Sequence, residues 1–215
     1  NKMAHTHNDP GKSLMWKGDT RGIADTGVFD YQAGENRSVS RSVKSHNTVQ
    51  VDEAEPVNYG GRFRMSGAII SRTTTATVSR VSAVTAQYET GERDQYQHRR
   101  TVFRDDSWLF VRDDIQSEAS QYTSRLHAHP DVSVRRDGKD VYFVREDGSE
   151  LRVKPIQLEE VDIETGPYFP RFGVEIERDV VEFRTSNQAF GYFILDEDID
   201  IEVEFEGLSQ MTAHI

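Results

Sequence analysis

The residues best suited to chemistry lie near the N-terminus of this 215-residue chain. His5 and His7 form a His-x-His pair, Asp25 ends a short apolar segment, and His46 follows a basic stretch. On a β-strand, side chains two positions apart point to the same face, so the pair would present both rings together. Imidazole nitrogens and a carboxylate oxygen suit Zn²⁺ or another first-row metal. The spacing favours a His/His/Asp metal site, although surface histidines also occur two positions apart by chance.

Two alternatives concern these ligands. Asp9 could serve as the carboxylate in place of Asp25, but Asp9-Pro10-Gly11 is typical of a turn, so we prefer Asp25. His127-Ala128-His129 is a second His-x-His pair, followed by Pro130 and by no third ligand nearby in the sequence. We interpret this second pair as structural.

Three blocks of the sequence together resemble a known family. They are His5–Asp9 (HTHND), Ile23–Gly27 (IADTG) and Arg37–Val49 (RSVSRSVKSHNTV). In content and order they resemble the heparinase II/III-like domain, which is the C-terminal β-sheet domain of several polysaccharide lyase families. Those lyases act on heparin or heparan sulfate, on alginate and on related uronic-acid polymers. Weaker similarity at Arg125–Pro130 and Gly166–Phe169 extends the resemblance over most of the chain.

The chain departs from the resembled pattern at two places. Relatives usually follow the first block with small residues and Ser-Phe, whereas this chain has PGKSL at Pro10–Leu14. The position before the second arginine, often aromatic in relatives, is Val39 or Ser40 here. The second departure bears on the substrate contacts.

The resemblance implies a role for the matched histidines and aspartate. It implies that His5 faces the substrate and takes part in acid/base chemistry. It also implies that His7, Asp25 and His46 hold a zinc ion, which organises the site and does not act as a Lewis acid. On the residues alone, His5 reads equally well as an ordinary surface histidine.

The resemblance also implies substrate contacts. Arg37 and Arg41 match basic positions that face the substrate, and a guanidinium can bind a carboxylate or sulfate through two parallel hydrogen bonds. Tyr31 matches a further substrate contact. Asn47 is placed in the same substrate-binding group, in which it would support its loop. On the residues alone, Arg37 and Arg41 could instead pair with acidic side chains of the chain itself.

Lyases of the resembled families cleave by β-elimination. A base removes the proton at C5, beside the uronic carboxylate, and an acid protonates the leaving glycosidic oxygen. The resemblance implies that an N-terminal α/α toroid supplies much of this machinery, and the toroid is not among the 215 residues. We therefore expect the C-terminal domain of a polysaccharide lyase, with an acidic polysaccharide or oligosaccharide and the toroid as partners. The alternative is a non-catalytic β-sandwich module that binds acidic glycans.

Short apolar stretches separated by turn signals indicate the fold. Turns are predicted at Lys17–Thr20, Asp105–Ser107, Asp137-Gly138 and Asp147-Gly148. Regular spacing of this kind predicts an all-β chain, an antiparallel β-sandwich of two sheets with little or no helix, in one domain over residues 1–215. Asn36–Ser45 is polar and basic without apolar periodicity, so we predict a loop that lines the site.

The composition limits the class of protein. Hydrophobic residues make up 35% and charged residues 29%, and the aromatic residues (2 Trp, 8 Tyr and 11 Phe) favour a folded domain over disorder. The absence of cysteine excludes disulfides and thiolate metal sites. We expect no membrane span, because no apolar run approaches about 18 residues. Nothing at Asn1–His5 resembles a signal peptide, and the family resemblance favours a periplasmic or secreted location.

The net charge of −11 is unevenly distributed. Residues 1–104 hold 15 Lys and Arg against 11 Asp and Glu, whereas residues 105–215 hold 11 against 26. An anionic ligand would be steered toward the first half, which carries the histidine blocks. We expect no nucleic-acid partner, and the sequence leaves open whether copies of the chain form a homo-oligomer.

Overall fold

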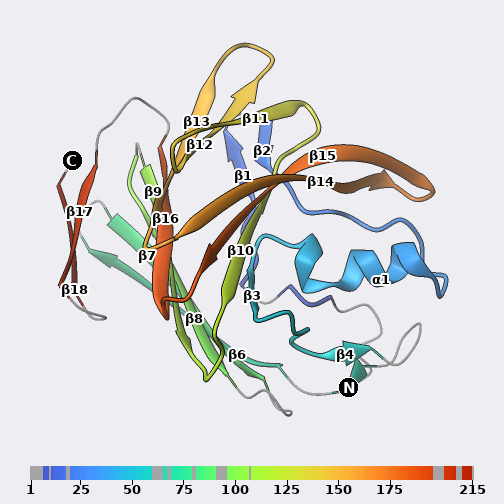
Figure 1. The fold of residues 1–215 in the computed structure, drawn as a ribbon, viewed down its shortest axis with the longest axis horizontal. Coiled ribbons are helices and arrows are strands. Elements are labelled where there is room, and N and C mark those ends of the chain that lie inside the picture. The colour runs from blue at the N-terminus through green and yellow to red at the C-terminus, as the bar shows by residue number, and fades with distance from the viewer. Residues whose placement is uncertain are drawn as a thin grey trace.

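The computed structural model describes residues 7–9, 11–17, 20–59, 65–66, 69–78, 81–90, 96–106, 108–195, 201–206 and 210–214. Two antiparallel sheets dominate this part of the chain (Figure 1). The larger sheet holds eight strands, which in spatial order are β11 (Val132–Asp137), β12 (Asp140–Arg145), β13 (Glu150–Ile156), β16 (Ala189–Leu195), β9 (Trp108–Gln116), β8 (Gln97–Arg104), β7 (Val81–Thr90) and β6 (Ile69–Val78). The smaller sheet holds four, in the order β14 (Glu160–Arg171), β15 (Val174–Thr185), β10 (Tyr122–His127) and β3 (Val49–Val51).

Three two-stranded ribbons complete the described strands. They pair β1 (Met15–Lys17) with β2 (Thr20–Ile23), β4 (Asn58–Tyr59) with β5 (Met65–Ser66), and β17 (Glu202–Glu206) with β18 (Gln210–His214). All these named strand pairs are antiparallel, so the predicted antiparallel β-sandwich is confirmed. Among the described residues, no helix is long and apolar enough to cross a membrane.

The two large sheets pack against each other through their apolar sides. Leu126 and Phe183 of the smaller sheet meet Phe143 and Tyr192 of the larger sheet in one buried cluster. Phe183 and Tyr192 stack with ring centroids 6.0 Å apart, which places β15 of one sheet against β16 of the other. An aromatic pair of this kind contributes about 0.5–1.5 kcal/mol beyond its buried area. These contacts make the two sheets the layers of a sandwich.

Strand β16 is buried along its full length, which explains why its sequence, AFGYFIL, shows no alternation. Phe190 and Tyr192 belong to the cluster between the sheets. Phe193 and Leu195 belong to a second cluster with Phe110, on the other side of the larger sheet. A strand covered on both faces is continuously apolar, as parallel-sheet strands usually are.

The turns predicted at Asp137-Gly138 and Asp147-Gly148 are confirmed, whereas those predicted at Lys17–Thr20 and Asp105–Ser107 include residues outside the described part of the chain. Asp137 pairs with Asp140 across the β11–β12 turn, in which Gly138 has φ +60°. Gly148, between β12 and β13, has φ +81°. Glycine adopts this left-handed region without the steric cost that a Cβ atom brings, so the Asp-Gly pairs fix these hairpins locally.

The prediction of a loop at Asn36–Ser45 is wrong. The chain forms helix α1 (Glu35–Arg41), followed by the short 3₁₀ helix η1 (Val43–Ser45). The buried residues of α1 are Arg37, Ser40 and Arg41. A helix that buries polar side chains shows no apolar repeat, which is the signal that sequence patterns rely on. A helix this short depends on its surroundings for stability, because isolated helices of such length do not persist in water.

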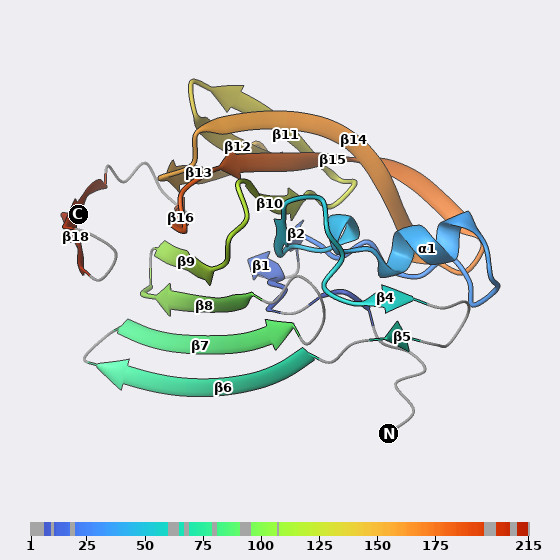
Figure 2. The same ribbon diagram turned by 60° about the horizontal axis from the view of Figure 1, so that its bottom comes forward.

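The long hairpin of β14 and β15 extends from the smaller sheet toward α1 (Figure 2). Near its tip, Phe169 N donates to Thr26 O at 2.7 Å, and Phe169 forms a parallel bridge with Gly27. Gly173 N also donates to Phe29 O, at 2.9 Å. The hairpin is therefore fastened to the segment that directly follows Asp25.

Replacing Gly27 by alanine should loosen this connection. Gly27 has φ +83°, and a Cβ atom there would lie 2.3 Å from Phe169 O. Because backbone must move to accept the methyl group, we expect Gly27→Ala to lower the free energy of unfolding by about 2–4 kcal/mol. Gly34→Ala is the matched control, since its Cβ would meet no atom within 4 Å. Denaturant unfolding measures both variants, and equal losses in the two would contradict the expectation.

Candidate functional site

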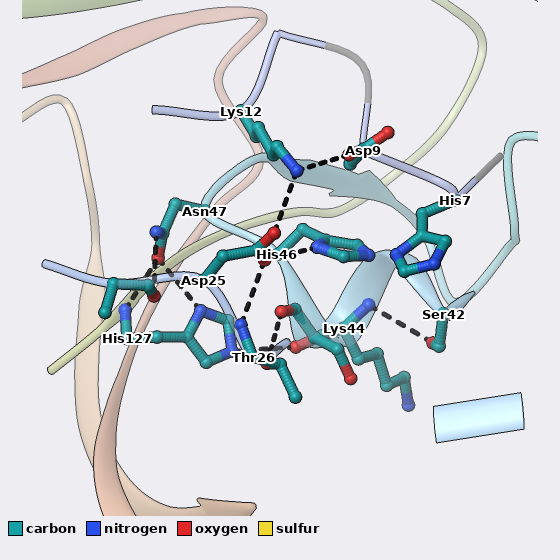
Figure 3. Close-up of polar contacts among 12 residues, drawn as sticks. His7, Asp9, Lys12, Asp25, Thr26, Ser42, Lys44, His46, Asn47 and His127 are labelled. Carbon is teal, nitrogen blue, oxygen red and sulfur yellow. Dashed lines mark hydrogen bonds and ion pairs between the residues drawn. The ribbon is translucent and has the colours of Figure 1, made fainter. Parts of the chain in front are cut away.

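Three segments meet at the candidate site: residues 7–9 with 11–12, residues 23–27 at the end of β2, and the turn after η1 (Figure 3). His46 Nδ1 lies 2.6 Å from Asp25 Oδ1, and the His46 side chain has no exposed surface. The rings of His7 and His46 are neighbours, with centroids 5.3 Å apart. The structure thus gathers the three residues predicted as metal ligands in one place.

His7 lies in irregular backbone, so the prediction that it belongs to a strand is wrong. The backbone at this point is tied to α1 and not to a sheet, because Asn8 N donates to Arg41 O at 2.9 Å. The Asn8 side chain donates to Val57 O at 3.0 Å and to Glu55 Oε2 at 2.5 Å. His5, the predicted catalytic residue, lies outside the described residues.

Asp9, predicted as a turn residue, also belongs to the site. It does form a turn, because Lys12 N donates to Asp9 O at 3.2 Å. Lys12 Nζ lies 2.6 Å from Asp9 Oδ2 and 2.8 Å from Asp25 Oδ2, so it bridges the two carboxylates. A turn residue can also be a metal ligand, so Asp9 and Asp25 need not be alternatives.

The donors present fit a divalent ion of the zinc class. One ligand atom each from Asp9, Asp25 and His46 lie within 4.8 Å of one another. His46 Nε2 is buried and has no hydrogen-bond partner in the described part of the chain. Buried polar atoms nearly always have a partner, so this nitrogen indicates a missing one. Imidazole nitrogen with carboxylate oxygen is a donor set that zinc and neighbouring first-row ions accept.

The protonation states also suit metal binding. Burial alone would raise the pKa of the Asp25 carboxyl, but hydrogen bonds from His46 and Lys12 hold this pKa well below its ordinary value. Burial, reinforced by His46, lowers the pKa of His7 to about 4. Near pH 7 Asp25 is therefore a carboxylate and His7 is neutral, the forms in which both can act as ligands.

The predicted substrate contacts differ in their exposure. Arg37 and Arg41 lie on the inner face of α1 and are 3% and 2% exposed. Arg37 Nη1 is 3.5 Å from His7 Nε2, and its guanidinium carbon is 5.1 Å from the centre of the Tyr31 ring. Tyr31 is 39% exposed and meets Phe172, at the tip of the β14–β15 hairpin, with ring centroids 5.1 Å apart. Arg37 thus lies between His7 and an aromatic pair that is open to solvent.

Asn47 joins the three segments of the site. Its Nδ2 donates to Ser13 O at 2.9 Å and to Ala24 O at 3.2 Å. Its Oδ1 accepts the backbone N–H of His127 at 2.7 Å. Because protein groups occupy the amide on both sides, the structure places Asn47 as a support of the site, within the group predicted to bind substrate. His127 lies beneath it, in keeping with its interpretation as structural.

Arg178 of β15 holds the Asp25 segment from the other side, and sequence reasoning missed it. Its Nη1 donates to Ala24 O at 3.0 Å, and its Nη2 donates to Thr26 Oγ1. Thr26 Oγ1 in turn donates to Ser45 O at 2.5 Å. Burial lowers the pKa of Arg178 to about 10, which leaves it charged at neutral pH. No local motif marks this arginine, because its partners lie far away in the sequence.

A second missed group links the site to the larger sheet. Arg100 of β8 donates through Nη1 to Asn47 O at 2.8 Å and to Gly11 O at 3.1 Å. Its Nε lies 2.7 Å from Asp113 Oδ1, and His98 Nε2 lies 2.6 Å from the same oxygen. His98 and Asp113 are fully buried. A buried arginine that is paired on one side can hold backbone carbonyls on the other.

Comparison with known proteins agrees with this architecture. The family model described as "Heparinase II/III-like, C-terminal" matches residues 1–205. Similar solved structures include a mutant of heparan sulfate lyase HepC from Pedobacter heparinus, with a TM-score of 0.73 and 19% identity over 94% of this chain and 33% of that chain. A crystal structure of heparinase III has a TM-score of 0.70 and 15% identity over 99% of this chain and 35% of that chain.

These structural likenesses, at such low identity, concern the fold alone. The chain spans about a third of the length of the solved structures that it matches. Comparison with curated proteins gives no match.

Removing the Asn47 amide should destabilise the whole site. Asn47→Ala leaves the His127 N–H and the Ser13 carbonyl without this partner, while Ala24 O keeps its bond from Arg178, and each unsatisfied buried group costs about 1–3 kcal/mol. We expect the free energy of unfolding to fall by roughly 2–4 kcal/mol. The exposed Gln121→Ala should change it by less than about 0.5 kcal/mol. Urea titration compares the two, and a near-neutral Asn47→Ala would contradict the role given to this amide.

Acid should destabilise the protein through His98 and Asp113. Burial lowers the pKa of His98, against the attraction of Asp113. Burial alone would raise the pKa of Asp113, but Arg100 and His98 lower it to about 2. Both folded pKa values lie below the unfolded ones, so both groups contribute stability that is present at neutral pH. The contribution of His98 is lost as the pH falls below about 6.5, and that of Asp113 as it falls from about 4 toward 2.

His98→Gln tests the first of these losses, since glutamine can still donate to Asp113. The thermal midpoint of this variant should fall less steeply between pH 7 and pH 5 than that of the wild type. Gln121→Ala, which removes no titratable group from an exposed position, should keep the wild-type slope. A His98→Gln slope as steep as that of the wild type would show that this histidine is not the group responsible.

Proposed function

This chain belongs to the heparinase II/III-like C-terminal family, and we propose that it is the C-terminal domain of a polysaccharide lyase. Its substrate would be a uronic-acid-containing polysaccharide, cleaved by β-elimination. We place heparan sulfate and related glycosaminoglycans first, because solved structures with this fold are named as heparan sulfate lyase and heparinase III. Alginate is the next polymer to test.

The observation that carries this proposal is the meeting of His7, Asp25 and His46 beside a buried arginine. The two imidazoles and the carboxylate form one cluster, and Arg37 lies 3.5 Å from His7. Residues that are 39 positions apart in the chain, His7 and His46, are thus held in contact by a framework of buried hydrogen bonds. Gathering such groups carries a desolvation cost, which a bound ion would help to offset.

We assign His7, Asp25 and His46 as the residues that would hold Zn²⁺, with Asp9 beside them. The bound ion would fix these side chains relative to one another and add positive charge next to the substrate carboxylate. The chain's own residues support this arrangement. Asn47 and Arg178 hold the ligand segments, and burial keeps His7 neutral.

The elimination breaks the C5–H bond and the C4–O bond and forms a C4–C5 double bond. We assign His5 to the acid/base chemistry, because the family resemblance implies this role and His5 is two residues before His7 in the sequence. Arg37 supplies fixed positive charge that stabilises the carboxylate as negative charge builds up at C5. Tyr31, open to solvent beside Arg37, offers a ring face to a sugar. The remaining proton donor would come from the N-terminal toroid.

A binding module without catalysis is the second candidate. It is favoured by the exposed aromatic pair of Tyr31 and Phe172 beside Arg37, which can receive a sugar ring without any catalytic group. The two candidates differ in one measurement. Full-length protein incubated with heparan sulfate or alginate should produce the ultraviolet absorbance of an unsaturated uronate if it is a lyase. Glycan binding without this chromophore would favour the module.

Within the full-length enzyme, His5→Ala should lower kcat by roughly 10²-fold, the usual scale for an acid/base group. The variant should retain bound zinc, because His5 is not among the assigned ligands. His46→Ala should instead lose the metal and lower stability as well. Steady-state kinetics and metal analysis of both variants test the division of roles. If His5→Ala kept full activity, its catalytic assignment would be wrong.

A further inference from the structure

We propose that Lys12 is an internal cation of the metal site, which competes with a metal ion for the carboxylates of Asp9 and Asp25. The inference rests on the metal site proposed above and adds a residue that controls its affinity. With Lys12 in place the two carboxylates are already bridged, so an ion can bind both of them only after the ammonium group has left.

The hydrogen bonds of Asp25 show which of its oxygens is involved. Oδ1 lies 2.6 Å from His46 Nδ1 and accepts the Thr26 N–H at 3.0 Å. Oδ2 accepts Lys12 Nζ at 2.8 Å, and the same Nζ lies 2.6 Å from Asp9 Oδ2. Lys12 therefore takes the Asp25 oxygen that other groups leave open, together with an oxygen of Asp9. Figure 3 shows the ammonium group between the two carboxylates.

The histidine side of the cluster indicates what the ammonium group does not supply. His46 Nε2 is fully buried and has no partner among the described atoms. An ammonium group has three donor hydrogens but no lone pair, and it serves here as a point charge between two anions. A divalent ion can accept lone pairs from imidazole and carboxylate together. Nε2 lies on the opposite side of the ring from Nδ1, which meets Asp25 Oδ1, so an ion between the two carboxylates would meet His46 through Nδ1. Lys12 thus stands in for an ion at the two carboxylates, while Nε2 faces His7 (Figure 3).

Charge makes the two cations alternatives. Asp9, Asp25 and Lys12 together carry one net negative charge when Lys12 is protonated. An ion bound to both carboxylates would lie within a few ångströms of Nζ, where two positive charges repel strongly in a partly buried setting. The Lys12 side chain is 33% exposed, so it can turn into solvent while the fold stays intact.

The backbone turn at Asp9 brings Lys12 to the site, because Lys12 N donates to Asp9 O at 3.2 Å. The lysine is thus held beside the carboxylate with which it pairs.

Two effects follow from this competition. The lysine weakens metal binding, because part of the binding free energy is used to displace it. It also stabilises the metal-free protein, because it separates two carboxylates that would otherwise repel each other. Replacing Lys12 by a neutral residue should therefore tighten metal binding and lower the stability of the metal-free form.

The test compares Lys12→Gln, Lys12→Arg and Lys44→Gln with the wild type in the full-length protein. Lys44→Gln is the matched control, since it removes one lysine charge from an exposed position two residues before His46. The Zn²⁺ dissociation constant is measured by competition with a chromophoric chelator at fixed pH and salt. Thermal unfolding after chelator treatment measures the metal-free form and confirms that each variant folds.

We expect Lys12→Gln to bind Zn²⁺ roughly tenfold more tightly than the wild type and to unfold at a lower temperature when metal-free. Lys12→Arg keeps the positive charge and should stay close to the wild type, as should Lys44→Gln. The expected result would be clearest if Lys12→Gln bound Zn²⁺ and the other three proteins bound none.

Unchanged or weaker binding by Lys12→Gln would overturn the inference, because Lys12 would then be neutral toward the ion or a support of its ligands. That outcome leaves the proposed metal site intact. Binding by none of the proteins would remove both the metal site and the competition, while the chromophore assay on heparan sulfate still decides the lyase function.

Discussion

The buried amide of Asn47 is the contact on which the rest of the site depends. It contacts three chain segments at once, through the backbone groups of Ser13, Ala24 and His127 and through the imidazole of His127. Backbone groups of this kind must be satisfied, so the amide fixes where Ser13, Ala24 and His127 lie relative to it. Because His46 precedes Asn47 directly, the position of its ring follows from the same constraint.

Around this amide the interior is unusually rich in positive charge. Arg37, Arg41, Arg100 and Arg178 are all buried near the candidate site. Arg100 is neutralised by Asp113, whereas Arg178 donates to the backbone carbonyl of Ala24 and to the Thr26 hydroxyl. Charges held in place by such contacts act on a ligand without reorganising when it arrives. Arg37 and Arg41, on the inner face of α1, belong to the half of the chain in which Lys and Arg outnumber Asp and Glu.

The parts of the structure that could be predicted are those encoded locally. Two adjacent residues are enough to predict each Asp-Gly turn. The continuously apolar sequence of β16 reflects burial on both of its faces. Helix α1 could not be predicted, because its buried face is made of Arg37, Ser40 and Arg41. The family resemblance predicts the cluster of His7, Asp25 and His46. The spacing of these residues alone does not decide between a metal site and ordinary surface side chains.

The supporting residues were out of reach for a related reason. Arg100, Asp113 and His98 lie in strands whose charged positions look like an ordinary solvent-facing side. Their burial depends on what the chain places above them, and no short pattern describes that. Asp9 fails for a different reason. The sequence predicts its turn correctly, but a turn prediction gives no information on whether the same carboxylate also faces the metal site.

The reach of these contacts along the chain has a consequence for how the protein comes to be folded. Arg178 meets Ala24 across 154 positions, and Arg100 meets Gly11 across 89. Contacts between such distant residues form only after most of the loop entropy between them has been lost, so they belong to the late part of folding. In a newly made chain, the local hairpins would therefore form before the side chains of the candidate metal site come together. The N-terminal histidine segment, cut out and studied as a peptide, would carry the ligands without the geometry.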